Sequence, residues 1–164
     1  MQAPSLLDCP PLPFSLPESA WGQDHGQLAT SDLQREMSDF CAAAREQSTG
    51  LNFAPRSIAS DILSIFAAGA LIERMRESEL NYSACGRALR AMLRDRFHWD
   101  DCDAAIRAGV LLAAARDREC RLAAAIEHGA AAMHAWQNAE RRAFAGFREI
   151  YADLSARTPR SART

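Results

Sequence analysis

The chain has 164 residues, 48% of them hydrophobic, and a formal net charge of −2 at pH 7. This length suits a single domain with a modest core. The slight acidity argues against a general nucleic-acid binder. No apolar stretch reaches the roughly eighteen residues of a membrane span. A secretory signal peptide is not predicted either, because no basic segment is followed by an apolar one at the N-terminus. We therefore expect a protein of the cytoplasm.

The basic residues are all arginine, nineteen in number, and the chain has no lysine. Because Arg and Ala codons are rich in G and C, this bias indicates a GC-rich bacterial genome. An alternative is a protein that acts inside a eukaryotic host, where the absence of lysine limits ubiquitin attachment. Residues 1–82 carry five arginines against eleven acids, and residues 83–164 carry fourteen against ten. Such asymmetry is typical of two halves that attract each other, or of a C-terminal half that faces nucleic acid.

The N-terminal segment, residues 1–29, contains five of the seven prolines. This composition predicts an extended or disordered arm. Its apolar residues, among them Phe14 and Trp21, would suit a groove of the folded domain. Polar N-termini with Ser and Pro also accompany proteins exported by contact-dependent secretion systems, so export without a signal peptide is a second expectation for localisation.

Three helices are predicted after the arm. Ser31 opens a capping box with the glutamine three residues later and predicts a helix over residues 31–46. Ser57 should cap a second helix that is apolar on most sides and therefore forms the centre of the core. Within it, Gly69 would allow a close crossing with another helix. A third helix is expected over residues 83–97.

The run over residues 101–154 has no proline and is rich in Ala and Arg, which favours one long helix. Unbroken, it would be roughly 80 Å long. A bend or break is therefore expected at Gly109, Gly129 or Gly146, with a helix over about residues 101–127 and a kink or continuation at Gly129.

Apolar residues in the second half of this run alternate by four and three, the spacing of a coiled-coil seam. In the first half Ile106, Val110 and Ala113 lie on a different face, which predicts that one helix serves two neighbours. Together the elements predict an all-α protein: a bundle of about four helices in a single domain over residues 30–154. A disordered Arg-rich tail is expected over residues 155–164.

The last part of the run carries the candidate partner-binding residues. They share one broad helical face and are Met133, Trp136, Phe144, Phe147 and Tyr151. Trp and Tyr, with the arginines interleaved here, are the residue types that dominate interface hot spots. The same face would serve equally well to close a bundle within the chain.

A second hypothesis is a small DNA-binding regulator, because residues 84–112 have the outline of a helix-turn-helix. The side chains for phosphate would be Arg87, Arg90, Arg94 and Arg107. A recognition helix, however, presents its N-terminal residues to the groove, and the acids at the start of the second helix repel phosphate. Nucleic acid is therefore the less favoured partner.

Catalytic and metal-binding motifs are not evident in the sequence. The five cysteines are odd in number and scattered, and they are typical of small buried residues in a reducing compartment. His98 and Cys102 are four apart, but no second close pair completes a metal site. We therefore predict no enzyme activity, cofactor or metal. The predicted function is a protein-protein interaction module, such as an adaptor, assembly factor, toxin-neutralising or secretion-associated protein, that binds another protein or itself.

Overall fold

The computed structural model describes the backbone of residues 23–77 and 81–156, and the side chains of residues 31–77 and 81–156. Within these ranges the chain forms helices and no strand, which confirms the all-α class. The helices are α1 (Gln23–Gln47), α2 (Ile58–Glu77), α3 (Tyr82–Phe97), α4 (Asp101–Arg116), α5 (Ala123–Gln137) and α6 (Ala145–Ala156). No helix of the described ranges is long and apolar enough to cross a membrane.

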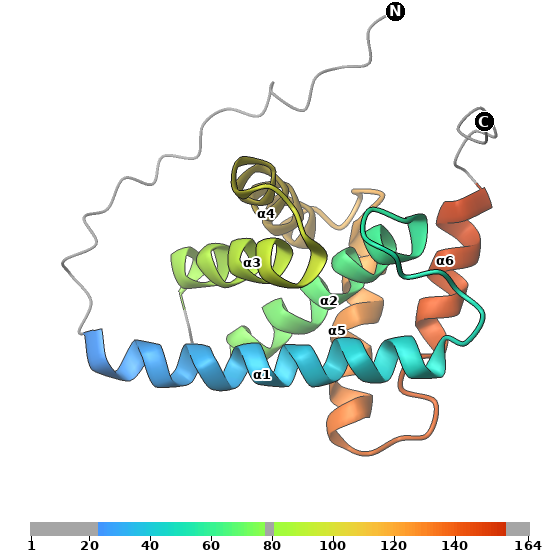
Figure 1. The fold of residues 1–164 in the computed structure, drawn as a ribbon, viewed down its shortest axis with the longest axis horizontal. Coiled ribbons are helices and arrows are strands. Elements are labelled where there is room, and N and C mark those ends of the chain that lie inside the picture. The colour runs from blue at the N-terminus through green and yellow to red at the C-terminus, as the bar shows by residue number, and fades with distance from the viewer. Residues whose placement is uncertain (1–22, 78–80, 157–164) are drawn as a thin grey trace, which may run out of the picture.

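Helix α2 forms the centre of the fold, as the sequence predicted. The Ser57 hydroxyl caps it by accepting a hydrogen bond from the backbone N–H of Ser60 at 3.2 Å. Most of its residues from Ala59 to Leu71 are buried, and α2 contacts each of the other described helices. Figure 1 shows α1 along the bottom of the bundle, α3 and α4 to the left of α2, and α6 on the right, with α5 between α2 and α6.

The close crossing predicted for Gly69 is present, and it is reciprocal. A Cβ added at Gly69 would overlap the carbonyl oxygen of Ile126 in α5. A Cβ added at Gly129 in α5 would overlap the carbonyl oxygen of Phe66 in α2. The two backbones therefore lie in direct contact, which only glycine permits at these two positions.

The prediction of one long C-terminal helix that breaks at a glycine is wrong. Residues 101–156 form three helices, which the loops at residues 117–122 and 138–144 separate. Gly109, Gly129 and Gly146 all lie inside helices. The expected bundle of about four helices therefore has six helices in the described ranges.

Local hydrogen bonding explains the two breaks. The Asp117 carboxylate accepts a hydrogen bond from the backbone N–H of Glu119 at 3.1 Å, a turn that competes with helix. In the second break Ala139 has a φ of 55°, and its neighbour Glu140 donates its N–H to the carbonyl of Ala135 at 2.9 Å. High helix propensity in the flanking alanines does not override these turns.

Two predicted helix starts also move. Helix α1 begins at Gln23, before the predicted start at Ser31, so part of the expected extended arm is helical. Helix α3 begins at Tyr82, one residue before the predicted start at Ser83, and the Asn81 side chain caps it by accepting a hydrogen bond from the N–H of Ala84 at 2.8 Å. The remainder of the predicted arm and most of the predicted tail lie outside the described residues.

Candidate functional site

The aromatic residues predicted to bind a partner lie mostly in the core. Met133, Phe144 and Phe147 are 1%, 2% and 0% exposed. Trp136 and Tyr151 are partly buried against that core. A partner could reach the first three side chains only if the fold opened, so their contacts are made within this chain.

Ring contacts give the physical reason for this burial. Phe144 lies edge-on to Phe40 of α1 at 5.0 Å between ring centroids, and Phe147 lies edge-on to Phe66 of α2 at 5.4 Å. Trp136 adds an edge contact to Phe40 at 5.7 Å. These pairs fasten α5, α6 and the loop between them to α1 and α2.

The arginines of the DNA-binding hypothesis are largely engaged with acids. Arg90 donates two hydrogen bonds to the Asp101 carboxylate, one of them at 3.1 Å. Arg94 pairs with Asp95 at 2.8 Å and lies 3.6 Å from Asp101. These hydrogen bonds hold the pKa of both carboxyl groups below the ordinary range. Arg87 contacts the Ser83 hydroxyl at 3.4 Å.

Arg107, the fourth of these arginines, lies against an indole ring rather than in open solvent. Its guanidinium carbon is 5.5 Å from the centre of the Trp99 ring, and that of Arg56 is 4.0 Å from the same ring. Burial lowers the pKa of Arg107, whereas the charge of Asp61 opposes that shift. Arg107 therefore packs within the fold, between α2 and α4.

The side of α4 that points away from the bundle is apolar and accessible. Cys102 and Ala113 are exposed, Gly109 is half-buried, and Ile106 is 43% exposed. These four residues, here named the α4 outer face, alternate by four, three and four, which aligns them on one side of the helix. The sequence pattern of Ile106, Val110 and Ala113 was predicted to be buried, and this prediction is wrong for Ile106 and Ala113.

The opposite side of α4 is also apolar, and it is buried. Its residues in the core are Ala104, Ala108, Leu111, Leu112 and Ala114. Helix α4 packs mainly on α3 and less on α5 and α2, so it lies at the edge of the bundle (Figure 1). An apolar helix with neighbours on only one side is left with an open apolar side.

A groove of about 260 Å³ runs beside the α4 outer face, between α3 and α4. Small residues form much of its wall, with Gly86 on α3 and Ala105 and Gly109 on α4. Arg87 and Arg90 stand along its α3 side. The groove and the outer face share Gly109, so they form one continuous surface.

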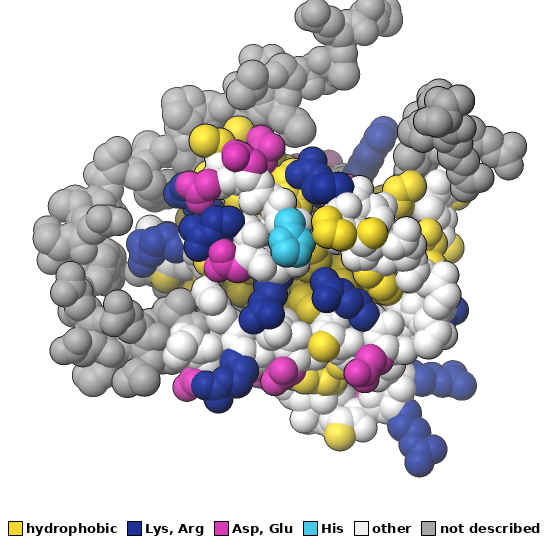
Figure 2. Space-filling model, in the orientation of Figure 1, with side chains coloured by type: hydrophobic (Ala, Val, Ile, Leu, Met, Phe, Trp, Pro, Cys, Tyr) yellow, Lys and Arg dark blue, Asp and Glu magenta, His cyan; other side chains and the backbone are white. Residues whose placement is uncertain are grey.

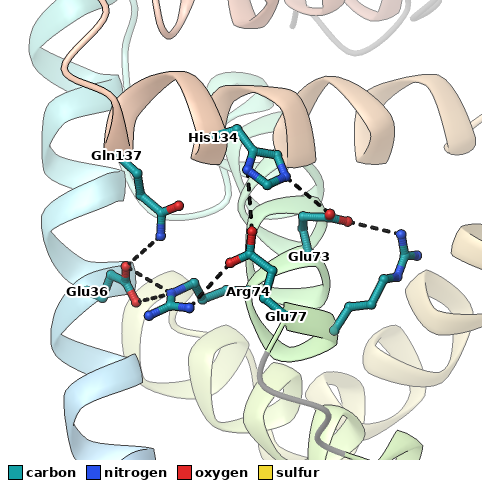
Figure 3. A network of polar contacts seen from close by, with 7 residues as sticks. Glu36, Glu73, Arg74, Glu77, His134 and Gln137 are labelled. Atoms are coloured by element: carbon teal, nitrogen blue, oxygen red, sulfur yellow. Dashed lines mark hydrogen bonds and ion pairs between the residues drawn. The ribbon is translucent and has the colours of Figure 1, made fainter.

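A polar network ties α1, α2 and α5 together at another place (Figure 3). Arg74 of α2 donates from Nε to the Glu36 carboxylate of α1 at 2.9 Å, and this hydrogen bond raises the pKa of Arg74. Gln137 of α5 donates to the same carboxylate at 3.0 Å. One carboxylate thus receives donors from two other helices.

His134 of α5 joins this network between two carboxylates, as Figure 3 shows. Its Nε2 is 3.2 Å from Glu73 and its Nδ1 is 3.4 Å from Glu77. Ligand atoms of the three residues lie within 4.8 Å of one another, a spacing that suits a metal ion. Arg76 and Arg74, however, already pair with Glu73 and Glu77 at 3.1 and 3.3 Å. The arrangement is accounted for as an ion-pair network between helices.

The remaining candidate side chains do not converge. His98 is the left-handed C-cap of α3, with a φ of 56°, and in the described residues no metal-type cluster contains it or Cys102. Cys41 and Cys85 are buried, and burial raises the pKa of each thiol to about 11. These thiols are poorly suited to act as nucleophiles at neutral pH.

Comparison of this chain with protein families, curated proteins and solved structures found no match.

Sequence reasoning missed the α4 outer face, although its signal is present in the sequence. Cys102, Ile106, Gly109 and Ala113 follow the four-and-three spacing of a seam, but so does the buried side of the same helix. Periodicity alone cannot show which of two apolar sides the rest of the chain covers.

Proposed function

We propose that this chain is a non-catalytic protein-protein interaction module and that the α4 outer face is its binding surface. The observation that carries the proposal is that α4 is apolar on two sides while the described fold covers only one. A helix that is apolar all round is ordinarily buried all round. A partner on α4 would complete that burial. An adaptor, assembly factor, toxin-neutralising or secretion-associated protein would each use such a surface.

The alignment of the α4 outer face supports the proposal more than its hydrophobicity does. Single exposed apolar residues are common on protein surfaces and need no explanation. Ile106 is different because Cys102, Gly109 and Ala113 extend its side of the helix without any charged side chain. Full burial of one isoleucine contributes about 1.5–3 kcal/mol. Ile106 is therefore the natural anchor of the contact.

The pairing of the arginines favours protein over nucleic acid as the partner. Arg90 and Arg94 are neutralised by Asp101 and Asp95, and Asp101 stands at the N-terminal end that a recognition helix would present to phosphate. Figure 2 shows acidic and basic side chains interleaved on the same face of the molecule, with hydrophobic side chains between them. A phosphate backbone favours a continuous basic surface.

The test is affinity capture from the native cells with the wild-type chain and two variants. Ile106→Glu places a charge in the α4 outer face, and we expect it to abolish capture of a specific protein. Ile58→Glu is the matched control, because Ile58 is 47% exposed but begins α2. Capture should persist in this control. Equal capture by wild type and Ile106→Glu would contradict the proposal, provided that all three proteins melt alike.

A further inference from the structure

We propose that Glu73 and Glu77 of α2 and His134 of α5 form a binding site for a divalent transition-metal ion of the zinc type. The proposal goes beyond the function proposed for the α4 outer face and does not depend on it, because these residues belong to the polar network of Figure 3. It follows from the ligand atoms that the fold brings together and from a charge that the ion pairs of this network leave unbalanced.

The crossing of α2 and α5 brings the three side chains together. Glu73 and Glu77 are four residues apart, so both carboxylates project from the same side of α2. Glu73 follows Gly69 by four residues, and His134 comes five residues after Gly129. At these two glycines the backbones of α2 and α5 touch. The crossing therefore places the imidazole of His134 against the carboxylate of Glu73, 61 positions earlier in the chain.

The three donor groups suit zinc in type and spacing. One ligand atom from each residue lies within 4.8 Å of the other two, and a tetrahedral zinc ion would draw such atoms to roughly 3.4 Å from one another. The two ring nitrogens of His134 already lie 3.2 and 3.4 Å from the two carboxylates. When one ring nitrogen binds the ion, the other faces a carboxylate that can accept its N–H, as metal-bound histidines usually require. Water would complete the coordination.

The ion pairs account for most of this network but leave one negative charge unbalanced. The network contains three carboxylates and two guanidinium groups, namely those of Glu36, Glu73, Glu77, Arg74 and Arg76. Three negative and two positive charges leave a net charge of −1, to which a neutral His134 adds nothing. A cation beside the carboxylates of α2 would compensate this charge, whereas an anion would be repelled.

The two arginines leave these carboxylates available to an ion. Arg76 is 69% exposed and pairs with Glu73 along the same helix at 3.1 Å. Surface pairs of this kind contribute little to stability, so Arg76 can turn to solvent. Arg74 donates to Glu36 at 2.9 Å, which is closer than the 3.3 Å of its contact with Glu77. Arg74 therefore keeps its main partner when Glu77 binds an ion.

Calorimetric titration with zinc at pH 7.5 measures the site directly. The wild-type chain should bind one zinc ion, and saturating zinc should raise its melting temperature. Glu73→Gln and His134→Gln should each weaken binding by on the order of tenfold or more. His128→Gln is the matched control, because His128 is exposed on the same helix and belongs to no metal-type cluster of the described residues. It should bind zinc as the wild type does.

Two results of this titration would overturn the proposal. One is the absence of saturable zinc binding by the wild type, or binding that His134→Gln leaves unchanged. The other is equal affinity for magnesium, because a hard cation that prefers oxygen ligands would not need the imidazole. Each ligand variant also removes an ion pair, so melting curves in the presence of a chelator must show that it is folded.

Arg76→Gln tests the site without changing a ligand. This variant removes a positive charge and a competing partner from Glu73, so it should bind zinc severalfold more tightly than the wild type. Its stability without zinc should change little, because Arg76 is largely exposed. Unchanged or weaker zinc binding would overturn the assignment of Glu73 as a ligand, since Arg76 would then not compete with the ion.

Cobalt distinguishes this site from the cysteines, which also bind such metals. Cys102 is exposed and Cys120 is partly accessible. Cobalt held by carboxylates and imidazole should give visible absorption bands without a thiolate-to-metal charge-transfer band. The double variant Cys102→Ser, Cys120→Ser should keep this spectrum and the zinc affinity of the wild type. A charge-transfer band in the wild type that the double variant loses would place the ion on the thiols and overturn the proposal.

Discussion

Helices α2 and α4 are both apolar over most of their circumference, but the fold treats them differently. Helix α2 contacts every other described helix, and most of its residues are buried. Helix α4 is buried on one side and exposed on the other, where Ile106 is 43% accessible. A helix that is apolar on most sides is therefore buried over most of its surface in α2 but only on one side in α4.

A glycine near the middle of each helix sharpens this contrast. Gly69 of α2 lies against the backbone of α5, and the absence of a side chain at Gly69 allows this contact. Gly109 of α4 is half-buried beside the groove between α3 and α4. Under the proposed function, the missing side chain of Gly109 would serve a partner of α4 in the way that Gly69 serves α5.

The largest effect should come from adding one methyl group to the α2–α5 crossing. In Gly129→Ala the new Cβ overlaps the carbonyl of Phe66, and neither backbone can move without separating the two helices. We expect a loss of about 5 kcal/mol or more in the free energy of unfolding, at the extreme end for a single substitution. Urea denaturation measures it.

Gly86→Ala provides the control for this prediction. A Cβ at Gly86 lies 3.5 Å from the Leu112 side chain, an ordinary contact, and alanine in a helix is favoured over glycine by up to about 1 kcal/mol. This variant should be neutral or slightly stabilised. Equal stability of the Gly129 and Gly86 variants would show that the α2–α5 crossing is looser than described.

A smaller but still large loss is expected at the aromatic residues of the core. Phe147 is 0% exposed and lies against Phe66 and Phe53. Phe147→Ala should cost about 3–5 kcal/mol through lost contacts and the cavity left behind. Tyr151→Ala, one turn later and partly exposed, should cost clearly less. If Phe147→Ala left the melting temperature unchanged, this residue would lie outside the core.

These aromatic residues show how far sequence reasoning reaches. Both Ser57 and Gly69 have the roles predicted for them, but Met133, Phe144 and Phe147, which were predicted to share one helical face, lie on α5, in the following loop and on α6. What the pattern could not tell was whether the partner of that face is another chain or Phe40 and Phe66 of the same chain. Contacts between residues a hundred positions apart leave no trace in local periodicity.

Helix boundaries were the second failure of sequence reasoning. Alanine-rich composition predicts helix but does not locate its ends, and the breaks predicted at glycines do not occur there. The side-chain turn at Asp117 and the left-handed residue Ala139 end the helices instead. The α4 outer face became recognisable only after these breaks separated α4 from α5.

A still smaller effect is expected where α4 begins. The Asp100 carboxylate accepts a hydrogen bond from the N–H of Cys102 at 2.9 Å. Asp100→Ala should therefore cost about 1 kcal/mol, and Asp100→Asn, which keeps the acceptor, much less. Thermal melts of both variants measure the difference. Equal losses would show that charge, rather than the cap hydrogen bond, stabilises this end of α4.

Alkylation of thiols at pH 8 is the smallest perturbation, because it compares the α4 outer face with the core without changing a residue. Cys102 lies exposed on the α4 outer face, whereas Cys41 is buried in the core. Burial raises the pKa of Cys41 to about 11, so only about one thiol in a thousand is ionised at pH 8. Mass spectrometry of digested protein should find Cys102 labelled quickly and Cys41 labelled only on unfolding. Equal labelling rates for Cys102 and Cys41 in the folded protein would contradict these two environments.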